Sequence, residues 1–147
     1  MRGIEFESDF GYGDVLNDLF FNISLNDYVF FMVEDEVFRE CGLIEIPSVA
    51  DVTFLGEMRA CAPYFVFSLN LQAYPIGASK QKINTYEDFE KSPCQFIVLI
   101  VDGRSFEIYA KDEQLLLCFI KNIIKLGGKN IKIKTIHEDG RVRMSVY

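Results

Sequence analysis

The sequence predicts an α+β fold, a mainly antiparallel sheet with helices packed on it. Several short segments alternate apolar and polar residues, which is the period of a half-buried strand, whereas residues 112–126 have the spacing of an amphipathic helix. No stretch rich in Gly, Pro or Ser divides the 147 residues. We therefore expect a single domain over residues 1–147, with the order β-β-α-β-β in its C-terminal half.

The N-terminal segment predicts a strand, a short helix and a second strand. Ile4–Glu7 alternates, and a turn at Phe10–Gly13 leads into a helix around Asp14–Asn22. The apolar run Tyr28–Val33 predicts the second strand. Because three acids follow it directly, we interpret Glu34–Glu36 as its turn, after which the chain returns as another strand.

The middle of the chain has one weak and one clear pattern. Residues 42–62 are the weak part, with a break at Pro47 and one or two helical turns over residues 56–62. Residues 64–74 alternate clearly as a strand that ends at Pro75. Its apolar face carries Phe65, Phe67, Leu69, Leu71 and Ala73, and its polar face carries Ser68, Asn70 and Gln72.

A hairpin is the most sharply defined local feature. After a polar loop (76–85) and a short acidic turn (86–90), Gln95–Val101 is continuously apolar, which is typical of a central strand covered on both faces. The pair Asp102-Gly103 then predicts a tight turn into an alternating strand at Ser105–Ala110.

The predicted helix over residues 112–126 has a signal at each end. Asp112 is its N-cap, and Gly127 is its stop. Two more alternating segments follow, at residues 130–136 and 141–147, and each predicts a strand.

Composition excludes several classes of protein. The chain is 50% hydrophobic and carries 22 acids against 15 Lys and Arg, a net charge of −7. It is too apolar for a disordered chain, and its apolar runs are far shorter than the roughly 20 residues of a membrane span. Residues 1–60 hold 13 acids and 3 bases, a charge of −10, whereas residues 61–147 sum to +3. The molecule is therefore expected to be acidic on one side.

The N-terminus and the cysteines predict a cytoplasmic protein. Acids stand where a secretory signal would need apolar residues. Cys41, Cys61, Cys94 and Cys118 form no Cys-x-x-Cys pair that could hold zinc or exchange disulfides. We expect all four to be buried, reduced thiols.

Five motifs resemble a known family of small Firmicutes proteins. The motifs are Arg2-Gly3-Ile4-x-Phe6-Glu7, Asn70-Leu71-Gln72-Ala73-Tyr74-Pro75, Tyr86-Glu87-Asp88-Phe89 with Ser92 and Cys94, Glu107-Ile108-Tyr109-x-Lys111-Asp112, and Arg141-x-Arg143-Met144-Ser145-Val146. They are similar to the family catalogued as domain of unknown function 2691. The resemblance covers nearly the whole chain, more weakly over residues 37–62. It implies a bacterial protein but no activity, substrate or catalytic residue.

Catalysis has little support in the residues. A nucleophile would need a cysteine such as Cys94 beside the one imidazole, His137, and a carboxylate such as Asp102 or Asp139. A buried thiol and a surface histidine explain the same residues. Neither a phosphate-binding loop nor a spaced set of metal ligands is present in the sequence. We therefore predict no catalytic, cofactor-binding or metal-ligating residue, and no bound cofactor. A small-ligand or enzyme site near Cys94, Asp102 and His137 stays open as an alternative.

Basic residues gather near the C-terminus and leave a second alternative, an RNA-binding module. The cluster consists of Lys121, Lys125, Lys129, Lys132, Lys134, Arg141 and Arg143. The chain as a whole is acidic and has no known reader motif, so nucleic acid is disfavoured as a partner. Lysines and arginines that protect a sheet edge explain the cluster equally well.

The favoured hypothesis is a non-catalytic protein-binding module, with an immunity protein or antitoxin-like inhibitor as a concrete case. The acidic half would meet a basic protein partner, and no membrane partner is expected. Candidate contact residues are the acids Glu34, Asp35 and Glu36 and the aromatic residues Tyr28 and Phe31. The adjacent aromatic residues have an equal explanation, a sheet packed on both faces. The sequence leaves the oligomeric state open.

Overall fold

The computed structural model describes residues 2–135 and residue 144. These residues form one antiparallel sheet of eight strands in the order β3-β2-β5-β6-β7-β1-β8, with β4 as a further partner of β2. The strands are β1 (Gly3–Glu7), β2 (Tyr28–Arg39), β3 (Gly42–Ile44), β4 (Val49–Ala50), β5 (Phe65–Pro75), β6 (Phe96–Val101), β7 (Ser105–Ala110) and β8 (Lys129–Lys134). The helices are α1 (Val15–Leu19), α2 (Thr53–Cys61), α3 (Tyr86–Lys91) and α4 (Glu113–Leu126). The α+β prediction is confirmed.

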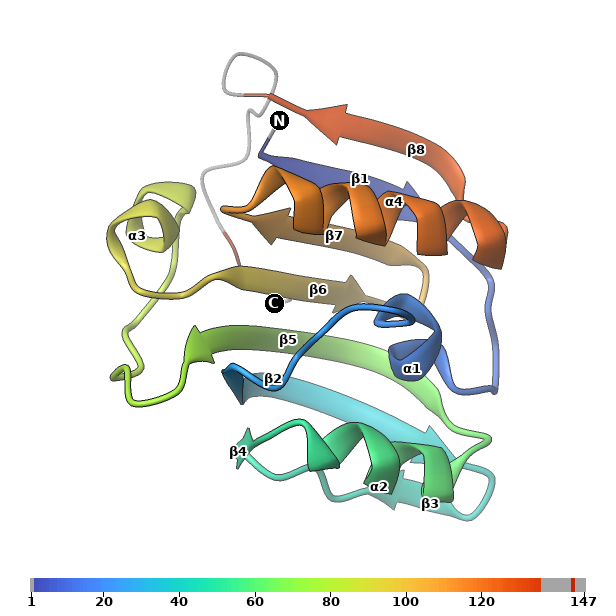
Figure 1. Cartoon of the computed structure of the whole chain (residues 1–147). Helices are drawn as coiled ribbons and strands as arrows, with labels where there is room; N and C mark the ends of the chain where they lie inside the picture. The colour runs from blue at the N-terminus through green and yellow to red at the C-terminus, as the bar shows by residue number, and fades with distance from the viewer. Residues whose placement is uncertain (1, 136–143, 145–147) are drawn as a thin grey trace.

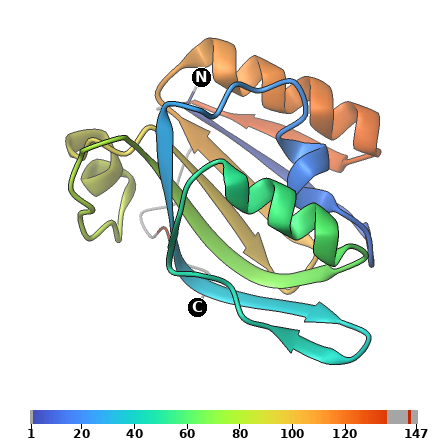
Figure 2. The ribbon, with the colours of Figure 1, turned by 60° about the horizontal axis from the view of Figure 1, so that its bottom comes forward.

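Helices α1, α2 and α4 lie on one face of the sheet, which we call the helical face (Figure 1; Figure 2). The main apolar core lies between these helices and the strands. Tyr64, just before β5, ties α1 to the sheet: its hydroxyl donates to Asp14 Oδ1 at 2.6 Å and accepts from the Leu16 backbone N–H at 3.1 Å. The core therefore fixes all three helices over the strands.

The predicted C-terminal helix is confirmed, together with both of its end signals. The Asp112 carboxylate accepts from the backbone N–H of Gln114 at 2.8 Å. Gly127 ends α4 with a φ of +84°, a conformation that glycine adopts at little cost. The helical spacing places Leu116, Phe119 and Ile123 on the buried side of α4, and the structure confirms them. Asn122 is buried as well, whereas Ile124, which has the same apolar spacing, is 62% exposed.

The opposite face, which we call the outer face, is covered at one end by α3. A second apolar cluster lies here and includes Phe89 of α3, Cys94, Ile97 and Met144. Because both faces are covered, every residue from Phe96 to Ile100 in β6 is buried, which confirms the central-strand prediction. The acidic turn expected at 86–90 is instead helix α3, which begins with a capping box between Thr85 and Asp88.

The turn expected at Glu34–Glu36 is wrong. These acids lie inside the 12-residue strand β2 and pair with Asn70, Leu69 and Ser68 of β5. The chain turns later, between Arg39 and Gly42. Register irregularities between Met32 and Glu34 and between Glu36 and Val37 flank the acids. Pairing with the long strand β5 outweighs the low strand propensity of consecutive acids.

The weakly patterned residues 42–62 form β3, β4 and a helix α2 longer than predicted. The strand predicted at residues 130–136 is β8 (Lys129–Lys134). The strand predicted at residues 141–147 lies outside the described residues, apart from Met144, which is buried.

Strand β5 departs from the prediction in two ways. The second irregularity in its pairing with β2 shifts the alternation, so Val66 belongs to the main core and the predicted Phe65 and Phe67 do not. The polar residues Ser68, Asn70 and Gln72 do lie on the outer face, but they are buried instead of solvated.

Candidate functional site

An open groove lies where the β2–β3 hairpin and the segment that follows β3 approach helix α2. Its volume is about 680 Å³. The described residues that line it are four acids and four apolar residues, with no base among them. They are Asp35, Glu36, Leu43, Ile44, Glu45, Ile46, Pro47 and Glu57. We call this feature the acidic groove.

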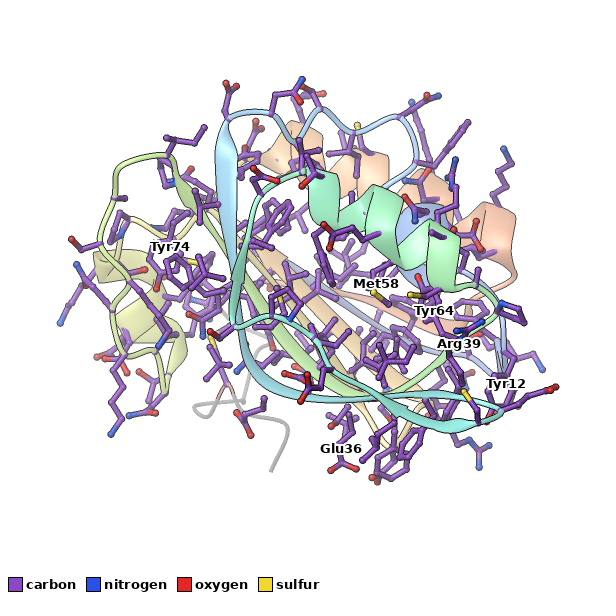
Figure 3. The ribbon with its side chains drawn as sticks, turned by 90° about the horizontal axis from the view of Figure 1, so that it is seen from below. Tyr12, Glu36, Arg39, Met58, Tyr64 and Tyr74 are labelled. Atoms are coloured by element: carbon purple, nitrogen blue, oxygen red, sulfur yellow. The ribbon has the colours of Figure 1, made fainter. Side chains whose placement is uncertain are left out.

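Three elements position the acids. In β2, Asp35 pairs with Leu69, a residue of the main core, so Asp35 lies on the helical face. Glu36 points away from the helices, on the side opposite Met58, and borders the groove from the outer face (Figure 3). Helix α2 buries Phe54, Leu55 and Met58, which leaves Glu57 exposed.

The apolar side of the groove comes from the edge of the sheet. Ile44 and Ile46 pack against the main core, whereas Leu43 is 68% exposed. Pro47 interrupts the edge between β3 and β4, and Pro at an edge prevents regular pairing with another strand. The groove therefore offers apolar contact and negative charge. At Pro47 its edge cannot pair with a strand of another chain through regular backbone hydrogen bonds.

Asp35 has a raised pKa in the acidic groove. Partial burial raises the pKa of its carboxyl group above the usual value, and the nearby charge of Glu36 raises it further. A cation bound in the groove would relieve both effects. The arrangement can thus bind a positive group.

The comparison with known proteins agrees with the sequence motifs. A family model described as "Protein of unknown function (DUF2691)" matches residues 1–145. The chain belongs to this family. The DUF2691 chain is also similar to the uncharacterized protein YncE of Bacillus subtilis (strain 168), with 25% identity over 152 residues and 99% of each chain covered. No solved structure matches it.

The five predicted contact residues of this DUF2691 chain do not form one surface. Asp35 and Glu36 border the groove, but Glu34 lies on the outer face, where it accepts a hydrogen bond from Asn70 at 3.4 Å. Tyr28 packs edge-on against Phe96 in the main core, and Phe31 packs edge-on against Tyr74 on the outer face. Sheet packing on both faces, the second explanation of these aromatic residues, is the one that the structure supports.

Sequence reasoning missed Glu45, Glu57 and Leu43. They are separated from Asp35 by up to 22 positions, and no local pattern connects them. The one available signal was the −10 charge of residues 1–60, which indicates an acidic side but not a groove.

The two described residues of the alternative small-ligand or enzyme site, Cys94 and Asp102, lie apart. Cys94 precedes β6 and Asp102 follows it, so the two lie at opposite ends of this strand, and His137 is outside the described residues. Burial raises the pKa of the Cys94 thiol to about 12, although Lys111 opposes the rise, so the nucleophilic thiolate is scarce at neutral pH. The expectation of four buried cysteines holds only for Cys94: Cys41 is exposed at the hairpin, and Cys61 and Cys118 are half-buried. All four are free thiols.

The basic cluster of the RNA alternative is partly neutralised. The Lys134 ammonium is 3.2 Å from Glu5 Oε2 and 3.8 Å from Glu107 Oε2, and its side chain is only 13% exposed. Lys132 pairs across the strands with Glu5, and Lys125 lies over the ring of Phe21. Arg141 and Arg143 lie outside the described residues.

Within residues 2–135 and residue 144, no three His, Cys, Asp or Glu side chains are grouped so that they could hold a metal ion. None of the described helices is long and apolar enough to cross a membrane.

Proposed function

We propose that this DUF2691 protein is a non-catalytic binding module whose acidic groove takes a basic segment of a partner protein. One observation carries the proposal: the described lining combines four acids with four apolar residues and no base. A segment that presents lysines or arginines beside apolar side chains is complementary in both respects. A small acidic inhibitor of a basic protein, like an immunity protein or an antitoxin, is the case that this chemistry fits.

The charge of the whole chain supports the same partner class. The net charge of −7 attracts a basic protein over a distance and repels acidic ones, including nucleic acids. The groove would then act at short range, where its carboxylates meet the cations and Leu43 meets apolar side chains. Steering of this kind is weakened by salt.

A double charge reversal in the groove tests the proposal. The probe is a fluorescent synthetic peptide that alternates lysine and leucine, and the measurement is fluorescence anisotropy at several salt concentrations. Glu45→Lys with Glu57→Lys changes two exposed acids of the groove. We expect an affinity loss of about tenfold or more, because two groove charges contribute up to about 1 kcal/mol each.

The matched control makes the same change of net charge elsewhere. Asp27→Lys with Glu87→Lys alters two exposed acids outside the groove. We expect an affinity change of less than about threefold, since distant surface charges are largely screened. Equal losses in the two variants would mean that the peptide responds to overall charge, and the groove proposal would be wrong.

Asp35→Asn provides an independent test that separates binding from folding. The raised pKa means that the folded chain binds the Asp35 proton more tightly than the unfolded chain does. Its contribution to stability is therefore fully present below the unfolded pKa and is lost as pH rises through the folded pKa. At pH 7 we expect Asn to raise the free energy of unfolding slightly, by less than about 1 kcal/mol because the group is partly exposed.

The same variant is expected to bind the lysine–leucine peptide more weakly. Urea denaturation at pH 3 and pH 7 measures the stability change, which should grow with pH, and anisotropy measures affinity. A variant that is less stable at pH 7, or that binds the peptide as well as the parent does, would contradict the role assigned to Asp35.

A further inference from the structure

A second, smaller pocket lies on the outer face, separate from the acidic groove. Its volume is about 130 Å³. The described residues that line it are Val33, Glu34, Asn70, Gln72, Lys80, Gln81, Lys82, Ile83, Asn84 and Met144. Its floor is the polar row of β5, so we call it the amide pocket.

The floor of the amide pocket carries two deeply buried amides with long hydrogen bonds. Asn70 and Gln72 are each 2% exposed. Asn70 Nδ2 donates to Glu34 at 3.4 Å, and Gln72 Nε2 donates to Asn70 Oδ1 at 3.4 Å. An amide nitrogen has two hydrogens to donate, and N–H···O bonds are usually nearer 2.9 Å. Gln72 Oε1 accepts from the Tyr74 hydroxyl at 3.3 Å, so each polar atom of the two amides has a partner. The second N–H of each amide nitrogen is the capacity left for a ligand.

Burial of such amides is costly unless they gain partners. A buried polar group whose hydrogen bonds are incomplete lowers stability, and apolar residues would pack at these positions without that cost. The neighbouring strand has apolar residues at the paired positions, Leu99 opposite Asn70 and Ile97 opposite Gln72. The exchange of apolar for amide side chains between β6 and β5, beside Glu34 of β2, indicates that the pocket is built to bind a polar molecule.

Residues 80–84 form the roof of the pocket, and hydrogen bonds hold this loop in place. Tyr74, on the outer face beside the loop (Figure 3), bonds through its hydroxyl to both the backbone N–H and the carbonyl of Gln81, at 3.1 Å each. At the other end of the loop, the Asn84 carbonyl accepts from the Met144 N–H at 2.7 Å. The backbone N–H of Asn84 donates to the Asp88 carboxylate at 2.9 Å. The pocket therefore exists before any ligand arrives, which lowers the cost of binding.

The pocket has opposite charges at two places. The Glu34 carboxylate adjoins the amide floor, and Lys80 and Lys82 lie in the exposed loop above it. A cavity of about 150 Å³ holds one benzene molecule, so the amide pocket has room for about six non-hydrogen atoms. From size, charge and amides together, we infer that the amide pocket binds a small amino-acid zwitterion, with its ammonium at Glu34 and its carboxylate at the lysines.

The test is binding of L-amino acids to the intact chain, measured by NMR chemical-shift changes. L-Alanine has the size of the pocket, and a panel of the common L-amino acids extends the search. Ethylamine lacks the carboxylate and propionate lacks the ammonium. We expect shifts at the backbone amides of Asn70, Gln72 and Gln81 with at least one amino acid, and at least tenfold weaker binding of the two half-ligands.

Gln72→Met distinguishes a ligand site from a structural amide. The substitution removes the amide at similar volume but takes a hydrogen-bond partner from Asn70 and from Tyr74, so a stability loss of about 1–3 kcal/mol is expected. We expect a folded chain with at least a tenfold loss of amino-acid affinity. Lys80→Met should weaken binding severalfold, whereas Lys91→Met, an exposed lysine of α3 outside the pocket lining, should not.

Three results would overturn the inference. The first is that no amino acid shifts these amides at millimolar concentration. The second is that ethylamine or propionate binds as well as the zwitterion does. The third is that Gln72→Met binds amino acids as tightly as the parent does, because the amide would then serve the fold alone. None of these results depends on the lysine–leucine peptide, so the proposals for the amide pocket and the acidic groove are tested independently.

Discussion

Phe96→Ala is expected to lower the free energy of unfolding by about 3–5 kcal/mol. Phe96 is 0% exposed at the start of the central strand β6. Its ring contacts those of Phe20, Tyr28, Phe30 and Phe119, with centroids 5.4–6.4 Å apart. Truncation leaves a cavity among side chains from three other parts of the chain, which cannot all move inward to fill it.

Urea denaturation at pH 7 measures this loss, and Phe21→Ala is the matched control. Phe21 is 50% exposed and lies 4.5 Å from the Lys125 ammonium. Its truncation should cost about 1 kcal/mol or less, since an exposed cation–π contact contributes about that amount. If the two variants lost equal stability, the aromatic cluster around Phe96 would not be the centre of the core.

Among glycine-to-alanine substitutions at the turns, Gly103→Ala is expected to lower the free energy of unfolding most, by about 2–5 kcal/mol. Gly103 has a φ of +66° in the β6–β7 turn, and a Cβ atom there would lie 2.2 Å from Phe65 Cζ. A left-handed conformation costs an L-residue about 1–2 kcal/mol, and overpacking adds about 1–3 kcal/mol. Both costs arise at one position.

Gly11→Ala separates the two costs. Gly11 has a φ of +61°, and no heavy atom lies within 4 Å of its ideal Cβ. Its substitution should cost only the conformational part, about 1–2 kcal/mol. Equal urea midpoints for the two alanine variants would show that Phe65 moves aside freely, contrary to the close packing described for the turn.

The sequence alone determined the elements whose signals are local. Asp112 and Gly127 mark the ends of α4 because capping depends on a few adjacent residues. Asp102-Gly103 marks the β6–β7 turn because its positive φ angles suit those two residue types. The unbroken apolar run of β6 indicated a strand covered on both faces before the covering elements were identified.

Tertiary structure alone decided where charged and polar residues lie. Glu34–Glu36 has the composition of a turn, yet β5 extends β2 through all three acids and places Asp35 and Glu36 on opposite faces. Similarly, alternation correctly placed Asn70 and Gln72 on the polar face of β5, but their burial depends on a loop ten residues further on and on Met144.

Both candidate sites therefore lie beyond the reach of sequence patterns. Propensity and periodicity report how a residue relates to its neighbours along the chain, over one or two turns or a few strand positions. The acidic groove joins β2, the segment after β3 and α2, and the amide pocket joins β2, β5 and the loop before α3. Their geometry follows from strand order and from what each face of the sheet packs against, which are set by the burial of the whole core.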